Sequence, residues 1–414
     1  MNFAPMIPAP RLAGELSPGA TRLFASGLPS YSAHVQAYGP LPAVPNPSAL
    51  VREIEASGLT GRGGAGFPTA RKIASLRSRA GAGGARPVVI ANGAEGEPLS
   101  IKDATLLRHA PHLVIDGLLL AASVAVAAEA YLYAGRDELA VVRRALGERQ
   151  DASIVRVHEA GDAFIAGEAS AVVNAVAGRP PVPADHIVRL SESGLGGRPT
   201  LVQNVETLAH VALVARYGAA WFRAAGTDAD PGTRLISVCR DRGPTHVAEV
   251  PGGIAIEDAL RAGLVNPRAA SAVLVGGFHG SWVPAQAFDT PLSSTGLAPF
   301  GAAPGAGILM ALGVGVCPLV VASGIADYLA LESARQCGPC VNGLPAMAAT
   351  LRGLATGERH SGLPAEVRRL AALVTGRGSC HHPDGTARFV LSTLTVFASE
   401  VEAHLVGRCM EVHS

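Results

Sequence analysis

Three cysteines stand at a spacing that could bind a metal centre. Cys337 and Cys340 form a C-x-x-C pair, and Cys380 follows in the later segment GRGSCHHPDG. This spacing directs two sulfurs toward one centre, and a third thiolate from a distant loop can complete a site for zinc or an iron–sulfur cluster. A redox dithiol is the alternative, but the βαβ context of thioredoxins is missing here. His381 and His382 are further candidate ligands, although we expect both to be exposed loop residues.

The other three cysteines, Cys239, Cys317 and Cys409, have no neighbours at ligand spacing. We expect them to be ordinary buried or surface thiols. Six cysteines in 414 residues are too few for a disulfide scaffold. The N-terminus lacks the basic segment and apolar run of a secretory signal, so we expect a cytoplasmic protein with reduced thiols.

The segment GRGGAGFP, residues 61–68, is the densest glycine cluster in the chain. Glycines let the backbone approach a ligand closely, and a helix that begins near Pro68 would direct free N–H groups at an anion. Arg62 and Lys72 could add positive charge. The cluster therefore indicates a phosphate cradle for a nucleotide or flavin, with a plain flexible turn as the alternative. It is not the dinucleotide-binding GxGxxG loop, because it precedes the first clear strand.

Three further segments keep polar residues in a mostly apolar chain, at 91–103, 163–181 and 197–211. Buried polar groups must be paired, so these residues indicate a ligand or a hydrogen-bond network. For any single one, a helix cap or a solvated loop is the alternative. The residues concerned are Asn92, Glu95, Glu97, Glu168, Asn204 and Glu206.

The hydrophobic pattern predicts an α/β domain over residues 49–227, after an N-terminal extension at 1–48 that is rich in proline, glycine and serine. Strand-like and helix-like segments alternate there, which predicts a parallel sheet with crossover helices. The expected strands are 86–93, 130–135 and 153–161, and the expected helices are 103–128 and 138–149.

Two further domains are expected after residue 227. Residues 228–305 alternate short β-like runs with turns and one helix, which predicts a small α+β unit. In residues 306–414, four long helical patterns with short loops predict an antiparallel helix bundle.

The charge balance excludes some classes of partner. Lys+Arg number 34 and Asp+Glu 33, without basic runs, so long-range charge attracts neither nucleic acid nor an anionic membrane surface. Residues 304–326 carry no charge and are long enough to span a bilayer. Internal Gly and Pro and the lack of flanking Lys/Arg or aromatic belts favour buried strands that run into a core helix.

These motifs together resemble the family of F-type subunits of respiratory complex I (NADH-quinone oxidoreductase), whose members bear FMN and oxidise NADH. The flavin subunits of NAD-dependent formate dehydrogenases and hydrogenases are relatives. The resemblance covers roughly residues 50–405 of this chain, as a divergent member. It rests on an intact GRGGAGFPT, on Glu95-x-Glu97-Pro98 and on Asn204-Val205-Glu206-Thr207-Leu208.

The resemblance implies an α/β flavin-binding domain, a small β-grasp-like (SLBB-type) α+β domain and a C-terminal four-helix bundle with a [4Fe–4S] cluster. It implies hydride transfer from NADH to FMN, followed by release of single electrons to a ferredoxin-like or quinone-linked partner. It assigns catalytic roles to Glu95 and Glu168, and cluster ligation to Cys337, Cys340 and Cys380. The implied FMN-binding residues are Gly61, Arg62, Gly63, Gly64, Ala65, Gly66, Phe67, Lys72, Asn92, Glu95, Gly167, Glu168, Asn204 and Thr207.

The chain departs from the family pattern around the flavin and the nicotinamide. Ala94 and Ala169 each stand where the family has an acid. Of the aromatics that stack on adenine in the family, Phe67 is kept, whereas the region of a second one reads HIVRL at 186–190. Arg189 in that region could meet the 2′-phosphate of NADPH.

The cluster motif departs as well, because Ala334 stands where its first cysteine belongs. Three thiolates are compatible with a [4Fe–4S] cluster that has a non-cysteine ligand, with a [3Fe–4S] cluster, or with no cluster. Two functions are therefore expected. One is an FMN-dependent NAD(P)H oxidoreductase, peripheral to the inner membrane through a partner at most. The other is a non-catalytic flavin or scaffold subunit that has lost nicotinamide binding.

Overall fold

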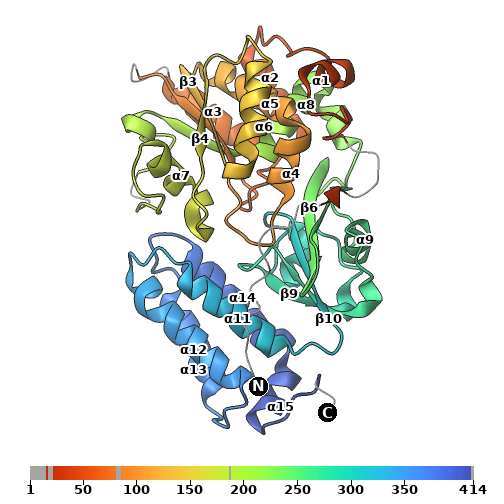
Figure 1. Ribbon diagram of the computed structural model, residues 1–414, viewed down its shortest axis with the longest axis vertical. Coiled ribbons are helices and arrows are strands. Elements are labelled where there is room, and N and C mark those ends of the chain that lie inside the picture. Colours follow the sequence, from red (N-terminus) through yellow and green to blue (C-terminus); the bar gives the residue numbers. More distant parts are fainter. Residues whose placement is uncertain (1–14, 17–21, 81–84, 186–187, 412–414) are drawn as a thin grey trace.

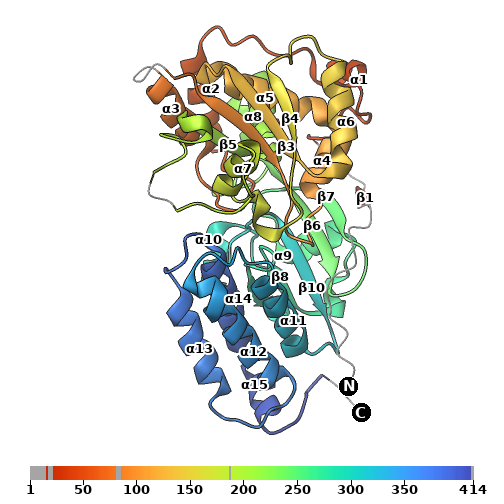
Figure 2. The ribbon, with the colours of Figure 1, turned by 60° about the vertical axis from the view of Figure 1, so that its left-hand side comes forward.

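The computed structural model describes residues 15–16, 22–80, 85–185 and 188–411, which form three regions. An α/β region occupies the upper part of Figure 1. A sheet of mixed strand direction and a helical region lie next to each other beneath it, and Figure 2 shows the same arrangement from a second side.

The α/β region is built on four parallel strands, which confirms the predicted parallel sheet. The strand order is β4-β3-β2-β5, and every neighbouring pair is parallel. The strands are β2 (Val88–Gly93), β3 (Glu129–Ala134), β4 (Val155–Glu159) and β5 (Thr200–Asn204). The helical elements are α1 (Tyr31–Tyr38), α2 (Pro47–Ser57), α3 (Thr69–Ala80), α4 (Lys102–His109), α5 (Pro111–Ala125), α6 (Arg136–Gly147), η1 (Phe164–Gly167), α7 (Ala169–Val176), η2 (Leu195–Gly197) and α8 (Val205–Arg223).

Both faces of the parallel sheet are buried, because alternate strand residues point to opposite sides and each side is covered. Val89 and Ala91 of β2 face the core that α5 and α8 build. Val88 and Ile90 face the opposite side, where they pack with Val172 of α7. The helical pattern over 103–128 is divided at Pro111, since proline cannot donate the hydrogen bond that continues a helix.

The second region is a six-stranded sheet in the order β1-β7-β6-β10-β8-β9. Its strands are β1 (Glu15–Leu16), β6 (Thr233–Arg240), β7 (His246–Pro251), β8 (Ala270–Val275), β9 (Ser281–Pro284) and β10 (Ile308–Gly313). The short helices among them are α9 (Ile256–Ala262), η3 (Pro267–Ala269), η4 (Ala285–Ala287), α10 (Ser294–Leu297) and η5 (Ala298–Phe300). Successive residues of these strands again point to opposite faces of the sheet. Val273 and Leu309 pack toward α9, whereas Leu274 and Met310 pack toward the helical region.

The sheet extends beyond the boundary expected at residue 305. β10 pairs parallel with β6 and antiparallel with β8, so the sheet ends at Gly313. The apolar run at 304–326 therefore holds one strand and the start of a helix. Its composition did not reveal this boundary, because periodicity alone does not separate a buried strand from a buried helix.

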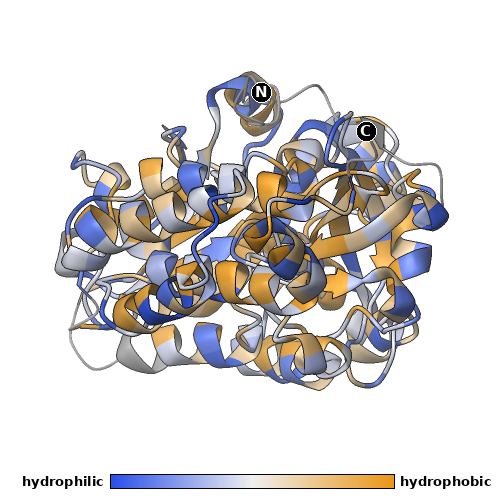
Figure 3. Cartoon of the chain, turned by 90° about the horizontal axis from the view of Figure 1, so that it is seen from below, coloured by the Kyte–Doolittle hydropathy of each residue, from blue (hydrophilic) through white to orange (hydrophobic). Residues whose placement is uncertain are grey.

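The third region is helical. Its elements are α11 (Pro318–Leu331), η6 (Pro339–Gly343), α12 (Leu344–Ala355), α13 (Leu363–Val374), α14 (His382–Val396) and α15 (Ala398–Leu405). α11 packs on α12, α12 on α13, α13 on α14, and α14 on both α11 and β9. Figure 3 shows mostly apolar residues along the strands, and both apolar and hydrophilic residues along the helices. Within the described ranges, no helix combines the length and apolarity that crossing a bilayer requires.

Candidate functional site

The strand order of the parallel sheet reverses between β2 and β5. The chain runs from β2 through β3 to β4 and then returns to the other side of β2 as β5. Asn92 of β2 and Asn204 of β5 are register partners near the carboxyl ends of these strands. Ligands of open α/β sheets bind at such a switch point, so the topology alone marks this edge as a candidate site.

The glycine cluster forms a closed loop at this edge. A bridge between Thr60 and Pro68 closes its base, and the N–H of Gly61 donates to the Phe67 carbonyl at 2.9 Å. The helix α3 follows directly at Thr69, as the sequence predicted. The loop therefore leads into a helix N-terminus, where free N–H groups favour an anion.

The loop is anchored on the first turn of α8. The backbone N–H of Arg62 donates to Thr207 Oγ1 at 2.8 Å. A Cβ atom added to Gly63 would come within 3.0 Å of Asn204 Cβ, so the close approach of these segments requires glycine. The structure thus brings together three predicted segments: the glycine loop, the end of β2 and the start of α8.

The outer edge of the loop is open. Gly64 and Gly66 have φ values of 121° and 61°, and a Cβ added to either would meet nothing within 4 Å. Both conformations are left-handed and favour glycine. Phe67 beside them exposes 53% of its side chain. The loop therefore offers bare backbone and an uncovered aromatic ring.

Lys72 supplies a cation next to the loop. Its Nζ donates to the Val202 carbonyl of β5 at 2.6 Å, and burial lowers the pKa of the amine to about 8. Among the described residues, no carboxylate contributes to that shift. A buried ammonium that lacks an acidic partner gains stability from an anionic ligand, which fits a phosphate.

Contrary to the expectation from the sequence, the side chain of Arg62 does not add positive charge at the glycine loop. Its guanidinium turns away, to Asp230 Oδ1 at 3.4 Å and to the carbonyls of Pro231 and Thr233 at 3.2 Å each. Only its backbone belongs to the loop. The side chain instead ties the α/β region to the mixed sheet, because a buried guanidinium needs several acceptors.

The two proposed catalytic acids are both helix caps in this structure. Glu95 accepts hydrogen bonds from Ser100 Oγ at 2.6 Å and from the N–H groups of Asp103 and Ala104 at 3.0 and 2.9 Å. Glu168 is the N-cap of α7 and accepts from the N–H of Ser170 at 2.9 Å. Their carboxylates thus hold α4 and α7 in place, which is the alternative that the sequence had left open.

The amide side chains also bind protein groups. Asn92 Nδ2 donates to the Gly167 carbonyl at 2.9 Å, and its Oδ1 accepts from the Ala94 N–H at 3.2 Å. Asn204 caps α8 and donates to Asp103 Oδ2 at 2.6 Å. These bonds place Gly167 and Ala94 at the carboxyl end of β2, so the amides shape the edge of the site.

Behind this edge lies a buried charge network. Lys102 Nζ lies 2.7 Å from Asp103 Oδ1 and 2.8 Å from Glu206 Oε2. These acids outweigh burial and raise the pKa of Lys102, which in turn lowers the pKa of Glu206 to about 2, whereas burial raises the pKa of Asp103 to about 7. The segments predicted to need a network, at 91–103 and 197–211, therefore have one.

Glu97 has one unused oxygen. Its Oε2 accepts from the Phe278 N–H at 3.2 Å, whereas its buried Oε1 has no hydrogen-bond partner among the described residues. Burial raises the pKa of this carboxyl to about 8. A partly buried acid with an unsatisfied oxygen is typical of a functional position, and sequence reasoning gave it no separate role.

The three predicted cluster cysteines are neighbours. Burial, together with Cys337 and Cys380, raises the pKa of the Cys340 thiol to about 12. Burial also raises the pKa of Cys380, and the backbone N–H groups of Arg335 and His382 partly oppose the increases at Cys340 and Cys380. Such N–H···S contacts stabilise thiolates, which is what an iron–sulfur cluster requires.

The residues around the missing cysteine keep an unusual backbone. Arg335, directly after Ala334, has a φ of 54°, in the left-handed region. In the family that the chain resembles, the cluster motif has a glycine at the position of Arg335. The loop therefore retains the backbone conformation of a glycine-containing motif although it has an arginine there. A left-handed backbone at a residue other than glycine raises the conformational energy by roughly 1 kcal/mol.

One of the two histidines beside Cys380 was predicted wrongly. His381 is exposed and lies 3.3 Å from Asp384, as expected. His382 is buried, because its ring bonds to His279 at 3.1 Å and to the Leu329 carbonyl at 2.8 Å. Its contacts come from the turn before β9 and from α11, so no local sequence signal could reveal them.

The turn η1 connects the two candidate sites. The Phe164 N–H donates to Glu332 Oε2 at 3.2 Å, and the Phe164 ring lies 4.9 Å from that of His279 and 5.5 Å from that of His382. At the other end of η1, Glu168 contributes to the raised pKa of Cys380. The segment that contacts Asn92 at the end of β2 thus also borders Cys380.

Two remaining predictions concern other places. His186 and Ile187 lie outside the described residues, and Arg189 is exposed, so its contact with a 2′-phosphate stays a prediction. Cys317 and Cys409 were expected to be ordinary buried or surface thiols; both are free cysteines, and the fold places them together with Glu400 and His404. Cys317 is more than eighty residues from the other three in the sequence, and only the fold brings it into contact with them.

Two family models match the chain. Residues 54–213 match the Nuo51 FMN-binding domain, and residues 320–404 match the NADH-ubiquinone oxidoreductase-F iron–sulfur binding region. The first match includes the glycine loop, both asparagines and Lys72. The second includes Cys337, Cys340 and Cys380. Together the matches cover more than half of the chain.

Whole-chain comparisons give the same class of protein. The second F-type subunit of NADH-quinone oxidoreductase from Rhizobium meliloti (strain 1021) is 29% identical over 89% of this chain and 91% of its own. The air-oxidised NAD+-reducing [NiFe]-hydrogenase structure aligns over 95% of this chain with a TM-score of 0.84 and 29% identity, covering 68% of that chain. Its H2-reduced form aligns over 89% of this chain and 64% of that one, with a TM-score of 0.79 and 30% identity.

The fold and the two sites thus define a flavin and iron–sulfur subunit of the complex I type. This chain belongs to the family of FMN-binding, F-type subunits of NADH-quinone oxidoreductase, as a distant member.

Proposed function

We propose that this protein oxidises NADH with bound FMN and passes single electrons through an iron–sulfur centre to a partner subunit. The observation that carries the proposal is the anion-binding edge at the β2/β5 switch point. There the open backbone of Gly64 and Gly66 lies beside the cation of Lys72, which no acid neutralises among the described residues. FMN carries a phosphate that fits this edge, and bound flavin accepts two electrons and releases them singly.

The residues of the chain divide the work between binding and positioning. The glycine loop and Lys72 hold the phosphate, and Phe67 offers an exposed ring for stacking on the adenine of NADH. Asn92, Asn204 and Thr207 keep the edge in shape through the bonds described above. Ala94 and Ala169, in place of acids, leave less negative charge around the flavin, which favours its reduced form.

The cluster residues fit the second half of this function. Cys337, Cys340 and Cys380 would hold the cluster, with backbone N–H groups stabilising two of the thiolates. Ala334 leaves the fourth position to another ligand or to a three-iron cluster. Phe164 and Glu168, at the two ends of η1, keep this centre next to the flavin edge.

The remaining fold and partner assignments follow from the same proposal. The mixed sheet would be the β-grasp-like (SLBB-type) domain of the family, and α11 to α14 its four-helix bundle. The electron acceptor would be a ferredoxin-like or quinone-linked subunit, and attachment to that subunit would place this chain at the periphery of a membrane complex. The domain limits would be those expected from the sequence, 1–48, 49–227, 228–305 and 306–414, with two changes: α1 and all of α2 join the α/β domain, and the mixed sheet extends to Gly313.

Anaerobic titration of the FMN-loaded full chain with NADH, and separately with NADPH, tests this function. NADH should bleach the flavin absorbance, and Phe67→Ala should raise the NADH concentration needed for half-bleaching. Val314→Ala, which truncates an exposed apolar side chain on another region, should leave it unchanged. A bound flavin that neither nucleotide bleaches would instead support a non-catalytic relay or scaffold subunit, the function that the replaced acids favour.

A further inference from the structure

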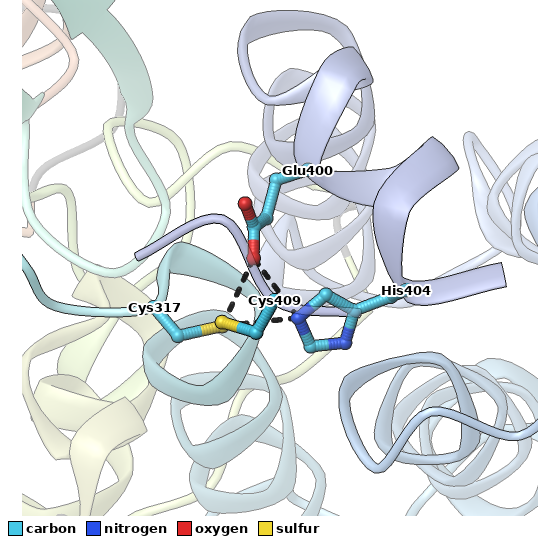
Figure 4. A group of neighbouring side chains, drawn as sticks. All are labelled: Cys317, Glu400, His404 and Cys409. Atoms are coloured by element: carbon cyan, nitrogen blue, oxygen red, sulfur yellow. Dashed lines mark hydrogen bonds and ion pairs between the residues drawn. The ribbon is translucent and has the colours of Figure 1, made fainter. Parts of the chain in front are cut away.

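A second group of metal-ligand residues lies at the far end of the helical region. Cys317 directly precedes α11, Glu400 and His404 are one turn apart on α15, and Cys409 follows α15. Their four candidate ligand atoms all lie within 4.8 Å of one another. Figure 4 shows the four side chains converging on one point. Neither the flavin nor the iron–sulfur centre of the proposed function uses any of them.

The group is separate from the cluster cysteines. Cys317 stands before the first turn of α11, whereas Cys337 and Cys340 follow its last turn. α11 has 14 residues and therefore separates the two groups by about 20 Å. The two groups thus lie at opposite ends of the same helix.

The distances within the group suit one small ion. Cys317 Sγ lies 3.5 Å from His404 Nε2 and 3.8 Å from Glu400 Oε1, and these last two atoms are 3.0 Å apart. Ligand atoms around a tetrahedral zinc ion have separations of this order, because each sits roughly 2.0–2.3 Å from the metal. The positions therefore need little rearrangement to bind one.

The orientation of His404 also favours a metal. Its Nδ1 lies 3.1 Å from the Leu354 carbonyl of α12, which can only accept a hydrogen bond. Nδ1 therefore carries the proton, and in the neutral ring Nε2 presents a lone pair to the centre of the group. A backbone carbonyl that fixes the tautomer in this way is typical of metal-binding histidines.

Burial makes the group costly without a cation. Cys317, Glu400 and His404 are 7%, 5% and 5% exposed, and they border the apolar core of α11, α12 and α14. Glu400 is further covered by the Met410 N–H, which lies 3.2 and 3.1 Å from its two oxygens. The charged partner of this carboxylate is His404, whose Nε2 lies 3.0 Å from Oε1 and forms an ion pair only when the ring is protonated, and no lysine or arginine contacts the carboxylate among the described residues. A divalent cation would neutralise the buried acid and the thiolates.

We propose that Cys317, Glu400, His404 and Cys409 bind a structural Zn²⁺ ion that fastens the C-terminal segment to the start of α11. Two sulfurs, one imidazole nitrogen and one carboxylate oxygen are ligands that zinc takes, and four protein ligands leave no open position for catalysis. The Gly315 N–H already bonds to Glu411 Oε2 at 3.0 Å, so the same two segments are in contact beside the site.

The test measures zinc and iron in the purified full chain by inductively coupled plasma mass spectrometry. One zinc ion per chain is expected in the wild type. Cys409→Ser and His404→Gln should each lower zinc affinity by more than about tenfold in competition with a chromogenic chelator, without changing the iron content. Glu402→Gln, an exposed change on the same helix, should retain the zinc.

Cys337→Ser separates this site from adventitious zinc at the cluster cysteines. Zinc that survives Cys337→Ser and is lost in Cys409→Ser supports the proposal. The reverse pattern would overturn it, as would wild-type protein without zinc, or a Cys317–Cys409 disulfide detected by mass spectrometry. Circular dichroism of each variant checks folding. If Cys409→Ser fails to fold, the absorption spectra of cobalt-loaded wild type and cobalt-loaded Cys337→Ser replace that comparison. A thiolate-to-cobalt charge-transfer band that persists in Cys337→Ser supports the site. Loss of the band in Cys337→Ser contradicts the site.

Discussion

At the scale of single residues, the functional edge depends on groups whose hydrogen bonds are incomplete. Lys72 has a carbonyl partner but no acid, and Glu97 leaves one oxygen unpaired among the described residues. Glu95 accepts hydrogen bonds on both oxygens and Glu168 accepts them on Oε2, and both carboxylates cap helices. A group whose hydrogen bonds are incomplete keeps the capacity to interact with a ligand, so Lys72 and Glu97 are candidates for a functional role.

Glu97→Gln should change how stability depends on pH. The pKa of Glu97 rises from 4.5 to about 8 on folding, so the unfolded chain loses this proton at lower pH than the folded chain. Stability from this group is therefore complete below about pH 4.5 and declines as the pH rises toward 8. Removing the acid should raise the free energy of unfolding at pH 8 relative to pH 5 by a few kcal/mol.

Urea unfolding of wild type and Glu97→Gln at pH 5 and pH 8 measures this difference. The exposed Glu402→Gln serves as the control and should leave the pH dependence unchanged. Parallel pH dependence in wild type and Glu97→Gln would show that Glu97 is ionised in the fold at pH 8.

Residue types and spacing predicted part of this chemistry. The glycine loop, Lys72 and the three cluster cysteines were identified because their signals are local. Glu95 and Glu168 were given catalytic roles from the resemblance; the structure shows that their carboxylates cap helices, and the catalytic roles stay a prediction. Cys317 gave no signal, because its partners lie more than eighty residues away in the chain. Cys409 gave none either, because its distance in the sequence from Glu400 and His404 matches no metal-binding motif.

At the scale of elements, the cluster loop keeps a conformation that its sequence disfavours. Arg335 has a left-handed backbone, and its N–H is directed at the sulfur of Cys340. A non-glycine residue keeps such a φ only where the surrounding structure imposes it, so the cluster loop holds Arg335 in the left-handed conformation. The strain suggests that the placement of Cys337 and Cys340 matters more than local stability.

Arg335→Gly should relieve this strain. The free energy of unfolding of the helical region should rise by about 1 kcal/mol, because glycine adopts a left-handed backbone without a Cβ clash. Arg335→Ala is the matched control, since it removes the charge but keeps the Cβ atom. Urea midpoints of the apo-proteins report the difference, and an equal midpoint in both variants would rule out backbone strain at this position.

At the scale of the whole molecule, three regions meet around η1. Phe164 contacts rings from the mixed sheet and the helical region, while the residues after it border the flavin edge. The sequence predicted the three regions from their different patterns. It could not predict this junction, because the contacts of Phe164 come from residues more than a hundred positions away.

Phe164→Ala should uncouple the α/β region from the helical region. The lost packing of a half-buried ring should cost about 2–3 kcal/mol. Differential scanning calorimetry should then resolve two transitions where the wild type has one. Phe67→Ala, which removes an exposed ring, should retain the single transition. One unshifted transition in Phe164→Ala would contradict a mechanical role for this junction.

The central claim is that the glycine loop and Lys72 hold the phosphate of FMN. Fluorescence titration of the apo-protein with FMN and with riboflavin, which lacks the phosphate, tests it directly. Wild type should bind FMN about 100-fold more tightly at pH 7, a difference of about 2.7 kcal/mol, and this preference should shrink above pH 8 as Lys72 loses its proton. Lys72→Met should lose most of the preference. Equal affinity of the wild type for both flavins would contradict the account.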